Sequence, residues 1–256
     1  MHGQSFCGKC FRRNTNLYLL TEDKMDTLAI VCTYNEATNI KKVVNDILNC
    51  GVEDIEVLVA DDVSPDGTYK IVEGMEKENP KIHLLLRTEK RGRGYAGIDA
   101  FKWGIQKGYK YLVELDGDGS HNPKYIKDFR ELINSCDVVI GSRYVKGGSD
   151  TQRGFLRQIV SHLSRRYLQF CIGVKVADAT SGYRMFKKEI VEQYIDKLKA
   201  SDPFIVTEML YYTKRTKAVI KEYPIAFLER ASGTSKLKPF TLIKYLFKVI
   251  KLRILA

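Results

Sequence analysis

Short apolar runs alternate with segments of helical periodicity over the first part of the chain. The runs are rich in Val, Ile and Leu, as in 28–32 and 55–60, which is typical of buried strands. Between them, apolar residues recur as in Ile40, Val43 and Ile47, which is the spacing of an amphipathic helix. Strands are predicted at 28–32, 55–60, 82–86, 111–115 and 137–140, and helices at 39–48, 68–78, 95–107 and 123–134.

This alternation of strands and helices predicts the fold class. It indicates an α/β fold with a mostly parallel, Rossmann-like sheet that is covered by helices on both faces. Ligands of such sheets bind beyond the carboxyl ends of the strands. Polar clusters follow three of the predicted strands at these ends, at 33–36, 61–62 and 116–118. We therefore expect the functional site along this edge of the sheet.

The rest of the chain has longer helical patterns with many basic side chains. In the last of them, Lys244, Lys248 and Lys251 share one helical face, and apolar residues such as Phe247 and Ile250 share another. Such a helix is typical of one that lies on an anionic membrane surface, and the alternative is docking to a membrane-anchoring partner subunit. Amphipathic helices are predicted at 155–171, 188–198, 204–212 and 241–255.

Composition and charge narrow the possible partners. The chain has 256 residues, of which 44% are hydrophobic and 29% charged, so it is an ordinary globular chain with room for one large or two small domains. The net charge of +11 is unevenly placed: residues 1–150 hold 21 basic and 23 acidic side chains, and the rest hold 21 and 8. The second part, at +13, therefore favours a polyanionic partner such as a phosphate, a nucleic acid or an anionic membrane.

Several segment types are not expected. No apolar run is long enough for a transmembrane helix, and residues 1–14 lack the apolar core of a signal peptide. Six cysteines without an export signal indicate reduced thiols on the cytoplasmic side. Cys7 and Cys10 lack the second ligand pair that a zinc site needs, so residues 1–26 are expected to be a flexible tail. Met25, just before the first predicted strand, is a candidate natural start.

The sharpest chemical signal is Asp116-Gly117-Asp118 at the end of a predicted strand. Two carboxylates at this spacing can converge on one divalent cation, and hard oxygen ligands suit Mg2+ or Mn2+. Such an ion can neutralise a diphosphate leaving group. The same three residues also occur in plain turns, but the pattern of a calcium loop is not completed here.

Other polar clusters are open to two interpretations. Asp61 and Asp62 can accept hydrogen bonds from a ribose or a base, or they can belong to a turn that includes residues 64–67. Gly92 and Gly94 can let the backbone approach a phosphate, although the dinucleotide-binding fingerprint is incomplete. The phosphate-binding loop of nucleoside triphosphatases and the nucleophile elbow of hydrolases are absent from the sequence.

The order of the motifs resembles that of the inverting GT-A glycosyltransferases of family 2. Within this family, residues 27–240 look most like dolichol-phosphate mannosyltransferases and their polyprenyl-phosphate relatives. The resemblance implies a nucleotide-sugar-binding part at 27–145, an acceptor part at 146–240 and a basic membrane-interface helix at 241–256. The motifs are T-Y-N-E at 33–36, D-D-x-S-P-D-G-T at 61–68, G-x-G-x-A at 92–96, D-x-D-x-S at 116–120, G-S-R-Y at 141–144, T-S-G-Y-R-M-F at 180–186 and S-K-L at 235–237.

The resemblance also implies roles for individual residues. Asp116, Asp118 and Arg143 are the implied catalytic residues. The donor nucleotide sugar is expected at Thr33, Tyr34, Glu36, Asp61, Asp62, Asp116, Arg230 and Lys236. The metal is expected at Asp116, Asp118 and Ser120, and the acceptor phosphate at Arg143, Arg157 and Ser161.

The implied activity is the transfer of a hexose to a polyprenyl phosphate of the dolichyl type, with inversion at the anomeric carbon. The first candidate is the transfer of mannose from GDP-mannose. The alternatives are transfer from a UDP-sugar, such as glucosyl transfer to undecaprenyl phosphate, or transfer to a saccharide hydroxyl. The enzyme would depend on Mg2+ or Mn2+ and act peripherally at the cytoplasmic side of a membrane. Nucleic acid is not an expected partner, because nucleic-acid binding would not explain the ordered set of motifs.

A lipid phosphate as acceptor is also favoured on chemical grounds. The second pKa of a phosphate monoester is about 6, so the acceptor is a dianionic nucleophile near neutral pH and needs no strong base. The Q-x-x-R-W motif of polysaccharide synthases is absent, since Trp103 is the only tryptophan. Arg157 and Ser161 lie one turn apart in a predicted amphipathic helix and can contact one phosphate. The alternative for this helix is core packing with solvated arginines.

Overall fold

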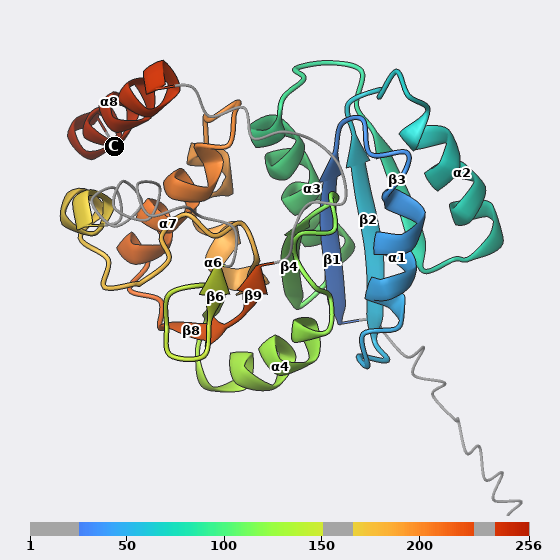
Figure 1. The fold of residues 1–256 in the computed structure, drawn as a ribbon, viewed down its shortest axis with the longest axis horizontal. Coiled ribbons are helices and arrows are strands. Elements are labelled where there is room, and N and C mark those ends of the chain that lie inside the picture. Colours follow the sequence, from blue (N-terminus) through green and yellow to red (C-terminus); the bar gives the residue numbers. More distant parts are fainter. Residues whose placement is uncertain (1–25, 151–165, 228–238, 256) are drawn as a thin grey trace, which may run out of the picture.

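The computed structural model describes residues 26–150, 166–227 and 239–255 (Figure 1). Within these ranges, strands and helices alternate as predicted for the first part of the chain. Predictions for Cys7, Cys10, Met25, Arg157, Ser161, Arg230 and Lys236 lie outside the described residues.

One sheet of seven strands forms the centre of the molecule, in the order β3-β2-β1-β4-β7-β5-β8. Neighbouring strands are parallel except β7, which runs antiparallel to both β4 and β5. The predicted α/β class with a mostly parallel sheet is therefore confirmed. The strands are β1 (Thr27–Thr33), β2 (Ile55–Asp61), β3 (Ile82–Leu86), β4 (Tyr111–Asp116), β5 (Val138–Ser142), β7 (Arg184–Lys187) and β8 (Ile220–Pro224).

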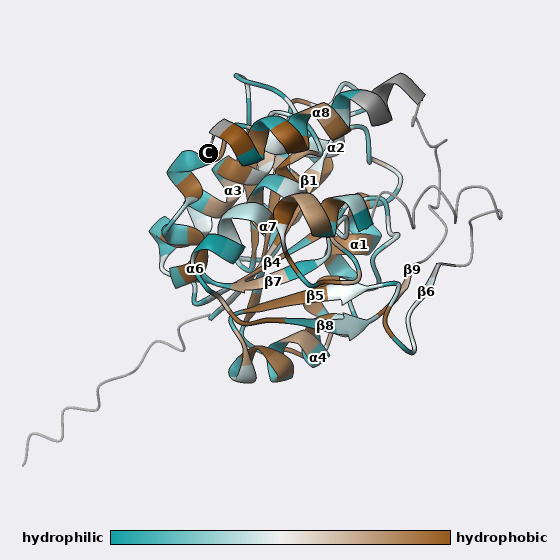
Figure 2. Ribbon diagram, turned by 90° about the vertical axis from the view of Figure 1, so that its left-hand side faces the viewer, coloured by the Kyte–Doolittle hydropathy of each residue, from teal (hydrophilic) through white to brown (hydrophobic). Residues whose placement is uncertain are grey.

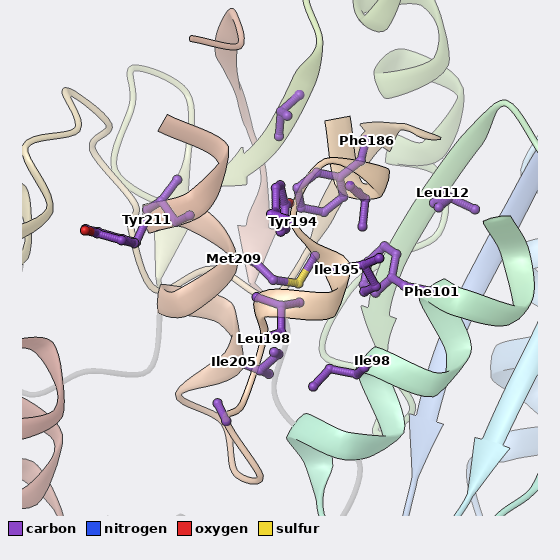
Figure 3. Packing of buried hydrophobic residues seen from close by; sticks show 14 of the residues in the cluster. Ile98, Phe101, Leu112, Phe186, Tyr194, Ile195, Leu198, Ile205, Met209 and Tyr211 are labelled. Atoms are coloured by element: carbon purple, nitrogen blue, oxygen red, sulfur yellow. The ribbon is translucent and has the colours of Figure 1, made fainter. Parts of the chain in front are cut away.

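Helices cover both faces of the sheet and define two apolar clusters. Side chains of α1, α2 and α4 pack with one face, through residues such as Val44, Val72 and Phe129. The other face packs against α3, α6 and α7, where Ile98 and Phe101 of α3 face the segment from Ile195 to Met209 (Figure 3). The helices are α1 (Ile40–Leu48), α2 (Thr68–Glu78), α3 (Arg93–Lys107), α4 (Tyr125–Leu132), α6 (Lys188–Glu192) and α7 (Ile205–Arg215).

The second part of the chain departs from the sequence prediction in three places. The helix expected at 188–198 ends at Glu192, and a short 3-10 turn follows at Ile195–Lys197. Neither β7 nor β8 was predicted, because each is short and carries charged residues. A small parallel pair, β6 (Ser149–Asp150) with β9 (Ala226–Phe227), lies beside the main sheet. Strands from both predicted parts of the chain thus share one sheet.

The C-terminal helix α8 (Pro239–Leu255) packs against the side of the molecule that carries α7 and the helical residues 166–172 (Figure 1). Val249 and Leu252 of α8 are buried. The hydroxyl of Tyr167 donates a hydrogen bond to the carbonyl of Leu246 at 3.0 Å. Among the described residues, no helix combines the length and apolar character needed to cross a membrane.

Candidate active site

Three of the predicted site residues meet at the carboxyl edge of the sheet. Thr33 is registered with Asp61 across β1 and β2, and Cys32 is registered with Asp116 across β1 and β4. The hydroxyl of Thr33 donates to Oδ2 of Asp61 at 2.8 Å. Asp61 also accepts hydrogen bonds from the backbone N–H of Ser64 at 2.7 Å and from its hydroxyl at 2.6 Å. Because Asp61 is fully buried, its visible role is to fix the turn after β2.

Side chains of that turn also hold the loop after β1. The N–H of Asn35 donates to the hydroxyl of Ser64, and the N–H of Glu36 donates to the hydroxyl of Thr68, each at 3.0 Å. The two loops therefore form one platform at the ends of β1 and β2. The side chain of Tyr34 stands 55% exposed on this platform, where a planar base can stack on it.

Asp62 links the platform to the start of α3. Its Oδ2 accepts the N–H of Gly92 at 2.7 Å, and its Oδ1 pairs with Arg87. Nε of Arg87 in turn donates to Asp99 at 2.9 Å. Asp62 is buried, so this network ties the loop after β2 to Arg87 and to the start of α3 from within.

Gly92 and Gly94 lie against the protein backbone. The structure therefore gives these glycines a packing role, in place of the approach to a phosphate that the sequence suggested. A Cβ on Gly94 would lie 2.0 Å from the carbonyl oxygen of Ala200, and one on Gly92 would lie 2.4 Å from that of Ser201. The N–H of Gly94 donates to the same Ser201 oxygen at 3.1 Å. The two glycines therefore allow residues 199–201 to pack on the start of α3. Glu208 secures this segment by accepting the N–H groups of residues 199 and 200.

Asp116 is the last residue of β4, and Asp118 lies in the turn that follows it, as predicted from the sequence. The side chain of Asp116 is 37% exposed, and Oδ1 of Asp118 accepts the N–H of Ser120 at 3.0 Å. The hydroxyl of Ser120 is buried and has no hydrogen-bond partner among the described residues. A buried hydroxyl without a partner is unfavourable unless a ligand satisfies it.

This donor set fits a divalent cation that is bound together with a diphosphate. Within the described ranges, no group of three or more His, Cys, Asp or Glu side chains is placed to hold a metal ion alone. Mg2+ is commonly held by one or two carboxylates and completes its shell with phosphate oxygens and water. Asp116, Asp118 and the hydroxyl of Ser120 match that requirement.

His121 fixes the end of β4 through a hydrogen bond to the backbone of Asp116. The N–H of Asp116 donates to Nδ1 of His121 at 3.0 Å, so this nitrogen is an acceptor without a proton. Burial lowers the pKa of His121, although Asp116 and Asp118 oppose the shift. The ring lies between those of Tyr183 and Phe227, at 5.0 and 5.5 Å between centroids.

Arg143 and Asp178 form a pair that lies near His121, because the ring of Phe227 contacts both His121 and Arg143. Nε and Nη2 of Arg143 donate to the two oxygens of Asp178 at 2.7 and 2.9 Å. The carboxylate of Glu222 accepts the N–H groups of Ala177 and Asp178, which holds Asp178 toward Arg143. The guanidinium of Arg143 lies 5.3 Å from the ring centre of Phe227, the ring that also contacts His121.

Asp178 is therefore the hydrogen-bonding partner of Arg143. Arg184, which follows the T-S-G-Y motif, donates to backbone carbonyl groups instead. Arg184 is buried and donates to the carbonyl oxygens of Val206 and Ala179 at 2.6 and 2.9 Å. Burial would raise the pKa of Asp178, but the hydrogen bonds and the charge of Arg143 outweigh it and hold this pKa below its usual value. A carboxyl group with a lowered pKa is a weak base.

Comparison with known proteins decides the family. Residues 28–195 match the family model of Glycosyl transferase family 2. The chain belongs to this family. The glycosyltransferase is 36% identical over 214 residues to the undecaprenyl-phosphate mannosyltransferase of Micrococcus luteus, covering 83% of this chain and 88% of that protein. It is 33% identical over 226 residues to the polyprenol monophosphomannose synthase of Mycolicibacterium smegmatis, covering 87% and 85%.

A solved structure supports the fold of the glycosyltransferase. The mannosyltransferase PcManGT from Pyrobaculum calidifontis, solved with GDP-Man and Mn2+, is 17% identical. It superimposes with a TM-score of 0.54 over 91% of this chain and 71% of that chain. The GT-A fold implied by the sequence resemblance is thus confirmed, and this structural relative binds Mn2+.

The structure brings most of the described site residues of the glycosyltransferase to one edge. Thr33, Asp61 and Asp116 meet through strand register, and Gly182 of the T-S-G-Y motif reaches the same point. A Cβ on Gly182 would lie 3.8 Å from Oδ1 of Asp116. Sequence reasoning missed a buried pair beneath this edge, Arg93 with Glu114, because no local pattern links the end of a turn to a strand interior.

Proposed function

We propose that this glycosyltransferase transfers mannose from GDP-mannose to the phosphate of a polyprenyl lipid, with inversion at the anomeric carbon. The similarity over more than four fifths of the chain to two enzymes named for polyprenyl-linked mannose transfer carries the proposal. The transferred sugar and the lipid-phosphate acceptor match what the sequence motifs implied. The GDP moiety, the inversion and the individual residue roles are the finer parts of the proposal.

The donor would lie on the platform at the ends of β1 and β2. Thr33, Glu36, Asp61 and Asp62 shape its loops, and the exposed ring of Tyr34 offers a stacking surface for the base. We assign Arg230 and Lys236 to the donor diphosphate, although both lie outside the described residues.

A divalent cation would be held by Asp116, Asp118 and Ser120. When bound, it supplies positive charge that stabilises the departing nucleoside diphosphate. The backbone of Asp116 is kept in place by the hydrogen bond from its N–H to His121. Mg2+ and Mn2+ both suit these oxygen ligands.

The acceptor phosphate would bind at Arg143, with Arg157 and Ser161 completing its site from outside the described residues. Asp178 orients the guanidinium and limits its motion, so that Arg143 is a pre-aligned cation. Because the acceptor is already a dianion near neutral pH, it attacks the anomeric carbon without a protein base. The lowered pKa of Asp178 agrees with a positioning role for this carboxylate.

We also propose that the enzyme acts as a peripheral protein at the cytoplasmic side of a membrane. Phe247 and Ile254 of α8 are 67% and 73% exposed, and Phe170 of the adjoining helical segment is 80% exposed. Arg253 joins the two helices by donating to the carbonyl of Phe170 at 3.0 Å. Exposed apolar groups beside Lys244, Lys251 and Arg253 are typical of a surface that enters the headgroup region of an anionic bilayer.

The three lysines predicted to share one face of α8 have different surroundings. Lys248 forms an ion pair with Asp202 in the segment before α7, whereas Lys244 and Lys251 are exposed. Apolar residues occur on both the inner and the outer side of α8 (Figure 2). The outer side therefore combines apolar and basic residues.

A donor panel tests the proposed function. The enzyme is incubated with Mn2+, a polyprenyl phosphate and labelled GDP-mannose, UDP-glucose or UDP-N-acetylglucosamine, and the lipid product is recovered by organic extraction. The proposal predicts label in the organic phase from GDP-mannose, and loss of this product in Asp118→Ala, while Asp46→Ala on the exposed side of α1 keeps it. Transfer from a UDP-sugar in preference to GDP-mannose would contradict the donor assignment. Near-normal turnover of Asp118→Ala in saturating metal would contradict the site.

A further inference from the structure

A largely buried ion pair lies beside Asp116, and the reaction as described above does not use it. Arg93, the first residue of α3, donates from Nη2 to Oε1 of Glu114 at 2.8 Å. Glu114 stands in β4 two residues before Asp116, so the two side chains emerge on the same face of the sheet. Glu114 is 1% exposed, and two cations face it: Arg93, which donates a hydrogen bond to it, and the buried Arg184, which is registered opposite it in β7.

The same guanidinium nitrogen lies near the proposed metal ligand. Nη2 of Arg93 is 3.8 Å from Oδ1 of Asp116, which is an ion pair by distance but too far for a hydrogen bond. Gly97 makes room for the pair, since a Cβ there would lie 3.3 Å from Nη1 of Arg93 and 3.4 Å from Oε1 of Glu114. Arg93 therefore sits between two carboxylates and is hydrogen-bonded to the deeper one.

Arg93 has unused hydrogen-bonding capacity at this position. Its Nη1 is buried and has no hydrogen-bond partner among the described residues. Burial would lower the pKa of Arg93, but the charges of Glu114 and Asp116 raise it overall, so the group stays a cation. Arginine and carboxylate form strong paired hydrogen bonds whenever they come within reach. If Glu114 released Arg93, the nearest carboxylate for that cation would be Asp116.

We propose that Glu114 is a positioning residue that retains Arg93 and so keeps it from hydrogen-bonding to the carboxylate of Asp116, which is a proposed ligand of the divalent cation. The inference rests on the proposed function, because it takes Asp116 as a metal ligand. Loss of Glu114 would let Arg93 pair directly with Asp116 and compete with the metal for its oxygens. Removal of both partners of the buried pair would remove the competitor as well.

Metal binding measured apart from turnover tests this role. Free Mn2+ is followed by electron paramagnetic resonance during titration of the full chain in the presence of GDP, and melting temperatures report folding. We expect Glu114→Gln to bind Mn2+ roughly tenfold more weakly, as is common for partners behind a metal ligand. The double variant Arg93→Leu/Glu114→Leu should bind Mn2+ nearly as the unsubstituted chain does. Because the buried Arg184 loses a neighbouring carboxylate in this variant, its melting temperature is measured first and the folded protein alone is titrated.

A merely structural pair predicts a different pattern. In that case Glu114→Gln would change the melting temperature and leave the Mn2+ affinity of the folded protein unchanged, which would overturn the proposal. A double variant as weak as Glu114→Gln would also overturn it, since no competing cation is left. Glu114→Asp, which keeps the charge on a shorter side chain, should fold and show an intermediate loss of affinity, and normal affinity would count against the proposal. If the unsubstituted chain binds no Mn2+ with GDP, this inference and the metal site fall together, whereas transfer to the lipid is tested separately by the donor panel.

Discussion

Arg143 and Asp178 form a two-point pair, with Nε 2.7 Å from Oδ2 and Nη2 2.9 Å from Oδ1. Both side chains are buried, and the N–H of Arg143 also donates to Asp178 at 3.2 Å. This geometry fixes the plane of the guanidinium before any acceptor arrives. In our account Arg143 thus contributes an oriented positive charge, and Asp178 contributes its orientation.

Substitution Asp178→Asn tests that orientation. The change leaves Arg143 buried without its counter-charge, so we expect a loss of about 3 kcal/mol in the free energy of unfolding. We also expect the KM for polyprenyl phosphate to rise while the KM for GDP-mannose changes little. Steady-state kinetics give the KM values, and urea unfolding gives the free energy of unfolding.

The matched control is Asp196→Asn, which removes an exposed carboxylate that pairs with Lys102 at the surface. Exposed pairs contribute at most about 1 kcal/mol. Equal effects of the two substitutions would contradict the account.

The stability contributed by Asp178 should depend on pH in a defined direction. Its pKa in the folded protein lies below the ordinary aspartate value of 3.8, despite burial, because of Arg143. A carboxyl group with a lowered pKa stabilises the folded state above its unfolded pKa, and this stability is lost as the pH falls through the folded value. Urea unfolding at a series of pH values should therefore show a constant difference between the native chain and Asp178→Asn at neutral pH. This difference should shrink only below the ordinary aspartate value. A difference that shrinks already near pH ~6, the range of histidine titration, would contradict the assignment.

Substitution by alanine should change the stability of the protein in opposite directions at two glycines, because one is packed against residues 199–201 and the other is not. Gly94→Ala places a Cβ 2.0 Å from a backbone oxygen, so the two segments must separate, at a cost of about 1–3 kcal/mol. Gly74→Ala, inside α2, has nothing within 4 Å of its new Cβ and should stabilise the protein by about 0.5–1 kcal/mol. Thermal melting of both variants checks the prediction. An unchanged melting temperature of Gly94→Ala would show that the close approach is not present in solution.

The outer side of α8 should bind anionic membranes. Substitution of Phe247 and Ile254 by serine removes exposed apolar groups and should abolish flotation with liposomes that contain phosphatidylglycerol. Lys244→Gln and Lys251→Gln should each weaken binding by about 1 kcal/mol at low salt. Lys42→Gln, on the exposed surface of α1, is the control and should have no effect. Binding that is absent, or that ignores both salt and these residues, would favour docking to a membrane-spanning partner subunit.

Local patterns were sufficient for much of the fold but not for its second part. The helix at 68–78 has the predicted ends, and the strand at 111–115 extends by one residue to Asp116. Strand β7 was missed because its four residues begin with the buried Arg184, and its place between β4 and β5 depends on partners distant in sequence. Helical periodicity continued past Glu192, but the packed chain turns there into a 3-10 turn.

The candidate site shows the same limit. The carboxylates at 116 and 118 could be placed from the sequence, because a strand followed by acidic residues is a local signal. The pairing of Arg143 with Asp178 spans 35 positions, and that of Arg93 with Glu114 spans 21, so neither has a periodic signature. Gly92 and Gly94 suggested a phosphate site because glycines allow any close approach, and only the fold shows that the approaching group is backbone.

The most direct test of the account is a comparison of two acceptors that differ only in the phosphate. Labelled GDP-mannose and Mn2+ are incubated with the enzyme and either a polyprenyl phosphate or the matching polyprenol, and the label in the organic phase is counted. We predict label transfer to the polyprenyl phosphate alone, because the dianionic phosphate is the nucleophile and Arg143 binds it. Equal transfer to the polyprenol, or label found only in water-soluble saccharide, would contradict the lipid-phosphate acceptor.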